Sequence, residues 1–262
     1  MKNRIKDLFG RKTGKILSVF YTAGFPTLNS TMEIADALAK AGADIIEIGI
    51  PYSDPVADGP TIQESNKIAL DNGTKLSLIL KQVREIRSHV GIPIILMGYV
   101  NPIIQYGVEK FANDAAAAGV DGVILPDLPM DVYLEEYKAL FDSLNISNTF
   151  LISPTTSEER IRKIDAVTDG FIYAVSASSI TGAKGDFAPE QIEYFTRLKA
   201  MKLKNPFLIG FGISNHATFE IASAHSAGAI VGSAFIQTLK NSTNVVDDVT
   251  AFVASIRNNG KA

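Results

Sequence analysis

The segment TMEIADALAKAGADIIEIG (residues 31–49) contains both kinds of element from which we expect this fold to be built. Residues 31–42 carry apolar side chains at helical spacing and close on Gly42, a residue that commonly follows the end of a helix. Residues 43–49 form a short apolar run, which is typical of a strand buried on both faces. A helix followed directly by such a strand is one repeat of an α/β protein with a parallel sheet.

The same alternation continues along the whole chain. We predict eight strands, at residues 16–24, 43–49, 93–98, 121–127, 148–152, 170–175, 206–212 and 227–233. Helices are predicted between them, among others at 31–42, 108–119, 131–144 and 157–168. Eight such units in 262 residues indicate a (β/α)8 barrel, also called a TIM barrel. Residues 2–9 predict an extra N-terminal helix that plugs the barrel, and the absence of any linker predicts a single domain, residues 1–262.

Composition excludes several classes of function. The chain has 25 Lys and Arg against 28 Asp and Glu, so it offers no basic field to nucleic acid or to an anionic membrane. It has no cysteine, which excludes disulfides, thiolate metal sites and a cysteine nucleophile. Its three histidines lie far apart in sequence, so we expect no metal site built on them. With no secretory signal and no apolar run long enough to span a bilayer, we expect a cytoplasmic protein.

Glu47 is the carboxylate that stands out most clearly in the apolar pattern. It lies near the C-terminal end of the strand predicted at 43–49, where catalytic groups of such barrels lie. Burial there would raise its pKa and suit it to exchange protons near neutral pH. A structural ion pair with a Lys or Arg inside the barrel is an equally good interpretation of the same residue.

Asp54 and Asp58 lie in the following loop, IPYSDPVADGP (50–60). Asp54 precedes a proline and Asp58 precedes a glycine, and both positions are typical of turns. If one of them folds back over the barrel mouth, it and Glu47 could divide acid and base work between two environments. A magnesium site built from all three carboxylates is a third interpretation. The pattern favours a turn for Asp54 and leaves Asp58 open.

The last two predicted strands end in GFG (210–212) and GS (232–233). Barrels often bind phosphate in this region, through backbone N–H groups and the N-terminus of a short helix. The two motifs together favour a phosphorylated substrate. Tyr173 and Phe20 lie near the ends of their strands and could flank a flat substrate, although packing within the barrel is the default expectation for aromatic side chains.

The run IEIGIPYSDPVADGP (46–60) closely resembles the signature of the tryptophan synthase alpha chain family. Further stretches that resemble this family follow in its order: FYTAGFPT (20–27), LMGYVNPI (96–103), ILPDLP (124–129), SSITGAKG (178–185), GFGIS (210–214) and AGAIVGS (227–233). The resemblance implies a lyase of tryptophan biosynthesis that cleaves indole-3-glycerol phosphate to indole and glyceraldehyde 3-phosphate. It also implies a pyridoxal-phosphate-dependent beta chain as partner in an α2β2 complex, with no cofactor bound to this chain itself.

The resemblance further implies a role for each matching residue. Glu47 would be the general acid/base, which protonates indole C3 and later takes the proton of the glycerol hydroxyl group. Asp58 would accept the indole N–H and stabilise the positive charge that develops on that nitrogen. The remaining implied contacts are Phe20 and Tyr99 with the indole ring, Tyr173 with the substrate near Glu47, Thr181 with Asp58 as the lid closes, and Gly182, Gly212, Gly232 and Ser233 with the phosphate.

Two loops are implied to contact the beta chain: the one after residues 43–49, with Pro51 and Asp54, and the one at 176–189. In the second loop Ser179 stands where the family usually has glycine, and its Cβ would stiffen the loop. A stand-alone indole-releasing lyase and a catalytically dead, phosphate-binding regulatory subunit are the alternatives. The presence of both Glu47 and Asp58 argues against the dead subunit.

Overall fold

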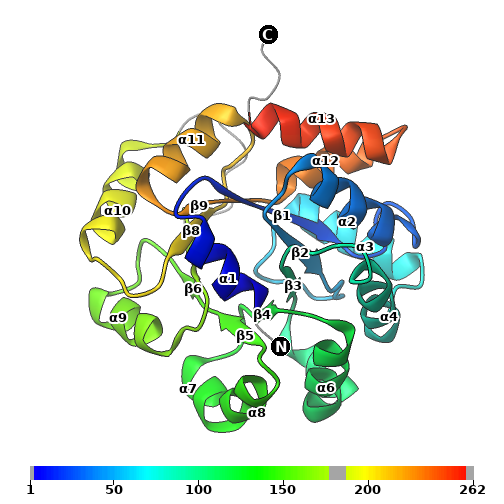
Figure 1. Ribbon diagram of the computed structural model, residues 1–262, viewed down its shortest axis with the longest axis horizontal. Helices are drawn as coiled ribbons and strands as arrows, with labels where there is room; N and C mark the ends of the chain where they lie inside the picture. The colour runs from blue at the N-terminus through cyan, green and yellow to red at the C-terminus, as the bar shows by residue number, and fades with distance from the viewer. Residues whose placement is uncertain (1–2, 177–186, 258–262) are drawn as a thin grey trace.

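The computed structural model describes residues 3–176 and 187–257, which form a ring of parallel strands surrounded by helices (Figure 1). The strands are β1 (Ile16–Thr22), β2 (Ile45–Gly49), β3 (Ile94–Met97), β4 (Gly122–Ile124), β5 (Ser147–Thr149), β6 (Leu151–Ile152), β7 (Ile172–Val175), β8 (Phe207–Gly210) and β9 (Gly228–Val231). Their order in the sheet is β5-β4-β3-β2-β1-β9-β8-β7-β6. The predicted (β/α)8 barrel is confirmed.

The ring closes through one split strand. Residues 148–152 were predicted to form a single strand, but β5 and β6 are separated at Phe150. β5 pairs with β4 and β6 pairs with β7, so the two pieces together join the ends of the sheet. The other seven predicted strands are present with shorter bounds.

Helices cover the outside of the ring (Figure 1). They are α2 (Ser30–Ala41), α3 (Pro60–Asp71), α4 (Leu76–Ile86), α5 (Val100–Tyr106), α6 (Val108–Ala118), α7 (Met130–Val132), the π-helical η1 (Tyr133–Tyr137), α8 (Lys138–Ser143), α9 (Glu158–Val167), α10 (Pro189–Ala200), α11 (His216–His225), α12 (Ser233–Lys240) and α13 (Val245–Arg257). The helix predicted at 131–144 is thus three consecutive pieces with a π-helical turn in the middle. In the described ranges no helix has the length and apolar character needed to cross a membrane.

Two apolar clusters divide the side chains of most strands. Ile46 and Ile48 of β2 pack between the sheet and the helices, whereas Ile45 belongs to a cluster inside the ring. Because successive side chains of a strand point to opposite faces, Glu47 shares the inner face with Ile45. The alternation therefore directs this carboxyl group into the barrel.

Helix α1 (Arg4–Arg11) crosses the N-terminal end of the ring (Figure 1). The Asn3 side chain accepts hydrogen bonds from the first backbone N–H groups of the helix and donates one to the Asp121 carbonyl oxygen. Ile5 and Leu8 are buried against the inner cluster. The predicted N-terminal helix and its plugging role are confirmed, with bounds shifted by two residues.

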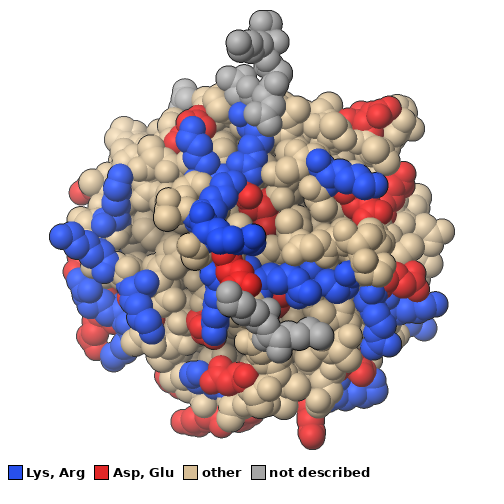
Figure 2. All heavy atoms as spheres, viewed as in Figure 1, with Lys and Arg blue, Asp and Glu red and all other residues tan. Residues whose placement is uncertain are grey.

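Ion pairs fasten the helices around this end. Asp121, just before β4, pairs with Arg4 and Arg87, and Asp44, just before β2, pairs with Lys12 and Arg257. Figure 2 shows this same face, where basic and acidic side chains lie side by side across α1. The N-terminal end of the barrel is therefore sealed by both apolar packing and charge pairing.

The substitution Ile5→Ala tests the plug. Ile5 is 0% exposed, and truncating such a side chain should lower the free energy of unfolding by about 2–5 kcal/mol, as measured by urea denaturation. Ile104→Ala is the matched control, because Ile104 is 54% exposed and should cost far less. If Ile5→Ala lowered the free energy of unfolding as little as Ile104→Ala does, α1 would not contribute to the core.

Candidate active site

A cavity of about 430 Å³ opens at the C-terminal ends of the strands, opposite α1. Its walls come from β1, β3, β7 and β9 and from the segments that follow β2, β7, β8 and β9. The lining includes Phe20, Asp58, Ile62, Met97, Tyr173, Ser176, Gln191, Phe211, Gly212, Ser214, Ile230, Gly232 and Ser233. Several residues singled out in the sequence thus meet around one space.

Glu47 lies beneath this cavity and is not among the residues that line it. Its backbone pairs with Phe20 across the β1–β2 ladder, and its side chain is fully buried. The Ser18 hydroxyl group donates a hydrogen bond of 2.6 Å to Glu47 Oε1, while Oε2 has no partner within the described residues. Burial raises the pKa of Glu47 to about 7, against the opposing effect of the Ser18 hydrogen bond.

The alternative interpretation of Glu47 as a structural ion-pair partner is not supported. Among the residues that the structure describes, no Lys or Arg forms a salt bridge with it. A buried carboxyl group without a cation keeps its proton up to near neutral pH. Such a group is suited to both donating and accepting a proton.

Asp58 is both a turn residue and a carboxyl group at the cavity, the two interpretations that its sequence context left open. Its backbone N–H donates to the Pro55 carbonyl oxygen at 3.0 Å and so closes a turn. Its side chain lines the cavity and accepts a hydrogen bond of 3.1 Å from the Tyr99 hydroxyl group. Burial raises the pKa of Asp58 to about 6, and the Tyr99 hydrogen bond acts in the opposite direction.

Asp54 is exposed and does not line the cavity. Within residues 3–176 and 187–257, no group of three or more His, Asp or Glu side chains is arranged to hold a metal ion. The magnesium site that the spacing of Glu47, Asp54 and Asp58 left open is therefore not formed by these residues.

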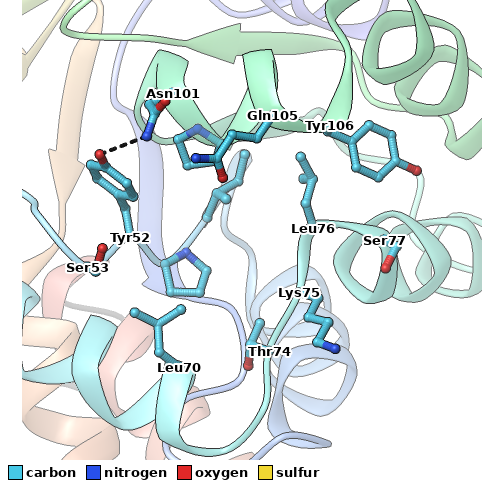
Figure 3. A pocket seen from close by; sticks show the side chains of 13 residues that line it. Tyr52, Ser53, Leu70, Thr74, Lys75, Leu76, Ser77, Asn101, Gln105 and Tyr106 are labelled. Atoms are coloured by element: carbon cyan, nitrogen blue, oxygen red, sulfur yellow. Dashed lines mark hydrogen bonds between the residues drawn. The ribbon is translucent and has the colours of Figure 1, made fainter.

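Tyr99 lies behind Asp58, at a small space that adjoins the main cavity. Its hydroxyl group accepts a hydrogen bond of 2.9 Å from the Ala57 backbone N–H and donates to Asp58, so it fixes both the loop and the carboxylate. The Tyr52 ring packs beside it, with ring centroids 5.4 Å apart, and Asn101 donates to the Tyr52 hydroxyl group (Figure 3). The contact between Tyr99 and Asp58 was not predicted from the sequence.

Tyr173 is the residue that lies close to both carboxyl groups. Its pKa is raised well above the usual value by burial and by the negative charges of Glu47 and Asp58, in that order of importance. The ring occupies space that a side chain at Gly210 would take, because a Cβ there would lie 2.1 Å from Tyr173 Cε2. Glycine at this strand end therefore makes room for the tyrosine.

The cavity ends at a site suited to an anion. Gly232 precedes the first residue of α12, Ser233, and the first N–H groups of a helix have no acceptor within it. Gly212, with φ of 76°, lines the same region, and the Ser176 hydroxyl group donates to the Phe211 carbonyl oxygen at 2.7 Å. Ser176, Gln191 and Ser214 were not predicted; Ser176 and Ser214 follow the ends of β7 and β8, whereas Gln191 lies in the first turn of α10. Ser179, Thr181 and Gly182 lie outside the described residues.

The substitution Tyr99→Phe tests the link to Asp58. Loss of the donated hydrogen bond removes a group that favours the ionised carboxylate, so the pKa of Asp58 should rise above about 6. The change can be followed by NMR titration of labelled aspartate carboxyl carbons. Tyr52→Phe is the control, since that hydroxyl group contacts Asn101 and not Asp58. An unchanged titration in Tyr99→Phe would contradict the assignment.

Comparisons with known proteins agree with this geometry. The sequence model of the family described as tryptophan synthase alpha chain matches residues 9–261. The chain is 53% identical over 255 residues to the tryptophan synthase alpha chain of Parabacteroides distasonis, covering 97% of this chain and 99% of that one. It is 52% identical over 254 residues to that of Flavobacterium psychrophilum, covering 97% and 99%.

Solved structures show the same likeness. The tryptophan synthase alpha chain from Legionella pneumophila superposes with a TM-score of 0.87 at 34% identity, covering 98% of this chain and 97% of that one. A chain of the aminoacrylate-bound tryptophan synthase from M. tuberculosis gives a TM-score of 0.85 at 29% identity, covering 97% and 98%. The match extends over nearly the whole chain in sequence and in structure, and this chain belongs to the tryptophan synthase alpha chain family.

Proposed function

We propose that this chain cleaves indole-3-glycerol phosphate to indole and glyceraldehyde 3-phosphate in tryptophan biosynthesis, as the alpha subunit of a cytoplasmic tryptophan synthase. The observation that carries the proposal is the pairing of two unlike carboxyl groups at one cavity. Glu47 is fully buried beneath it, and Asp58 is half-buried at its wall. Family membership supports the choice of substrate.

The phosphate of the substrate binds at the far end of the cavity. Gly212, Gly232 and Ser233 line this end, and the N-terminus of α12 presents backbone N–H groups and the positive end of the helix dipole. The indole ring then lies toward Phe20 and Tyr173. Gly182 and Thr181 complete the site by the family resemblance.

The reaction begins with proton transfer from Glu47 to indole C3. This converts the indole ring into an iminium form with a positive charge on nitrogen. Glu47, now ionised, takes the proton of the glycerol hydroxyl group as the carbon–carbon bond to C3 breaks. The electron pair of that bond returns to the ring and neutralises the nitrogen, so indole and an aldehyde are released and Glu47 regains its proton. Asp58 accepts the indole N–H and stabilises the transient positive charge.

The partner is a tryptophan synthase beta chain, which carries the pyridoxal phosphate, in an α2β2 complex. This chain itself requires no cofactor. The loop after β2 contributes Pro51 and Asp54 to the contact, together with the loop at 176–189. The pocket in Figure 3, which Pro51, Tyr52 and Asn101 line, is consistent with this assignment. Asp54 and Val56 of the same loop are exposed.

The decisive experiment measures indole release from indole-3-glycerol phosphate by the purified chain, with and without a beta chain. Slow release that the beta chain accelerates is the expected result. Fast release that the beta chain does not change would favour a stand-alone lyase. No release in either case, from folded protein, would favour a regulatory subunit and overturn the proposal.

The substitutions Glu47→Gln and Asp58→Asn test the two carboxyl groups. Glu47→Gln removes the proton-transfer group but keeps an acceptor for Ser18, so turnover should fall roughly 10²–10⁴-fold in a folded protein. Asp58→Asn removes the negative charge and should lower turnover by roughly 10²–10³-fold. Both are measured as kcat in the indole-release assay. Activity near that of the wild type in either variant would remove that residue from the mechanism.

A further inference from the structure

One polar contact inside the barrel is not used by the mechanism above. Ser18 belongs to β1 and is 0% exposed, and its backbone pairs with Ile45. Its hydroxyl group lies 2.6 Å from Glu47 Oε1. This distance is that of a close O–H···O hydrogen bond.

Apolar packing does not account for a serine at this position. Ser18 shares the inner face of the ring with Ile16, where the neighbouring side chains form an apolar cluster. A buried hydroxyl group is unfavourable unless it is hydrogen-bonded, so packing alone gives no reason for a serine here. Within the described residues, Glu47 Oε1 is the group to which this hydroxyl is bonded.

We propose that Ser18 is a positioning residue for Glu47: its hydroxyl group holds Oε1, and Oε2 is the oxygen that exchanges the proton with the substrate. The proposal rests on the proposed function, which makes Glu47 the acid/base. Oε2 is buried and has no partner in the described part of the chain. The two oxygens of one carboxyl group are thus unequal before any substrate arrives.

The surroundings of Glu47 leave Ser18 as its main polar contact. Phe20 and Ser18 pack against it from β1, Ile95 pairs with it from β3, and Tyr173 of β7 lies close by. Tyr173 is the titratable group close to it, and the charge of Asp58 also acts on this tyrosine. In the described residues no cation shares this space, so the stabilisation of ionised Glu47 comes from a hydroxyl group.

The register between β1 and β2 defines the side from which Ser18 binds the Glu47 carboxyl group. Phe20 is the residue opposite Glu47, and Ser18 lies two positions nearer the N-terminal end of β1. Oε1 is therefore bound from the side away from the cavity. Because the serine donates to Oε1 whether Oε2 is protonated or not, the carboxyl group keeps one orientation through both proton transfers.

The substitution Ser18→Ala tests this role by two measurements. In the first, the free protein is labelled at glutamate carboxyl carbons and titrated by NMR, with Glu47→Gln identifying the signal. Loss of the donor should raise the pKa of Glu47 above about 7, by about one pH unit. In the second, kcat for indole release in the presence of a beta chain should fall about tenfold with little change in KM, because Ser18 does not contact the substrate.

The pH dependence of kcat/KM gives a further test of the shift in the pKa of Glu47. The first step requires protonated Glu47, so kcat/KM should fall as pH rises through its pKa. Ser18→Ala should move this alkaline limb to higher pH. A serine with a merely structural role would alter the thermal midpoint but move neither the limb nor the titration.

Ser147→Ala is the matched control. Ser147 is 2% exposed and loses a buried hydrogen bond from Asn3, far from Glu47 at the N-terminal end. It should lower stability as Ser18→Ala does and leave kcat and the titration unchanged. Equal kinetic effects in both variants, or wild-type titration and kcat in Ser18→Ala, would overturn the positioning role. The wild type could release no indole while the pKa of Glu47 rises in Ser18→Ala as expected. In that case the proposed function would fail, but the positioning of Glu47 by Ser18 would stand.

Discussion

The burial of one carboxyl group inside a largely apolar ring of strands is the constraint on which the candidate site depends. Glu47 faces inward because it lies two positions after the core residue Ile45 on the same strand. Burial disfavours its charged form, and the described residues place no cation beside it. Its pKa therefore rises to about 7, where a carboxyl group can give and accept a proton. An ion pair would keep it charged and remove that capacity.

Asp121 shows how the same sheet treats a carboxylate that serves stability. It precedes β4 at the N-terminal end of the barrel, is 3% exposed, and pairs with Arg4 and Arg87. Its partners belong to α1 and to the end of α4, so the charge fastens two helices to the ring. Asp121 is as deeply buried as many core residues, and two guanidinium groups compensate its negative charge. Stabilising charges at one end and proton chemistry at the other is the division expected of such barrels.

The parts of the structure that follow from local pattern were predictable, and those that depend on contacts between distant segments were not. The strand at 45–49 and the helix α1 are set by apolar spacing, which is visible in one segment at a time. The break at Phe150 depends on how the ring closes between β4 and β7. The Tyr99–Asp58 contact spans 41 positions, and the Ser18–Glu47 contact spans 29. A serine within an apolar run carries no signal until the register between two strands is known.

Both carboxyl groups of the candidate site are held by hydroxyl groups and not by cations. Ser18 donates to Glu47 and Tyr99 donates to Asp58, and each hydrogen bond favours the ionised form against the effect of burial. A neutral donor offsets burial only in part, whereas an arginine would pull the pKa far below neutral pH. Burial therefore raises the pKa of the fully buried Glu47 to about 7 and that of the half-buried Asp58 to about 6. The more deeply buried Glu47 is thus the more readily protonated of the two, which in the proposed mechanism suits Glu47 to act as the acid and Asp58 as the anion.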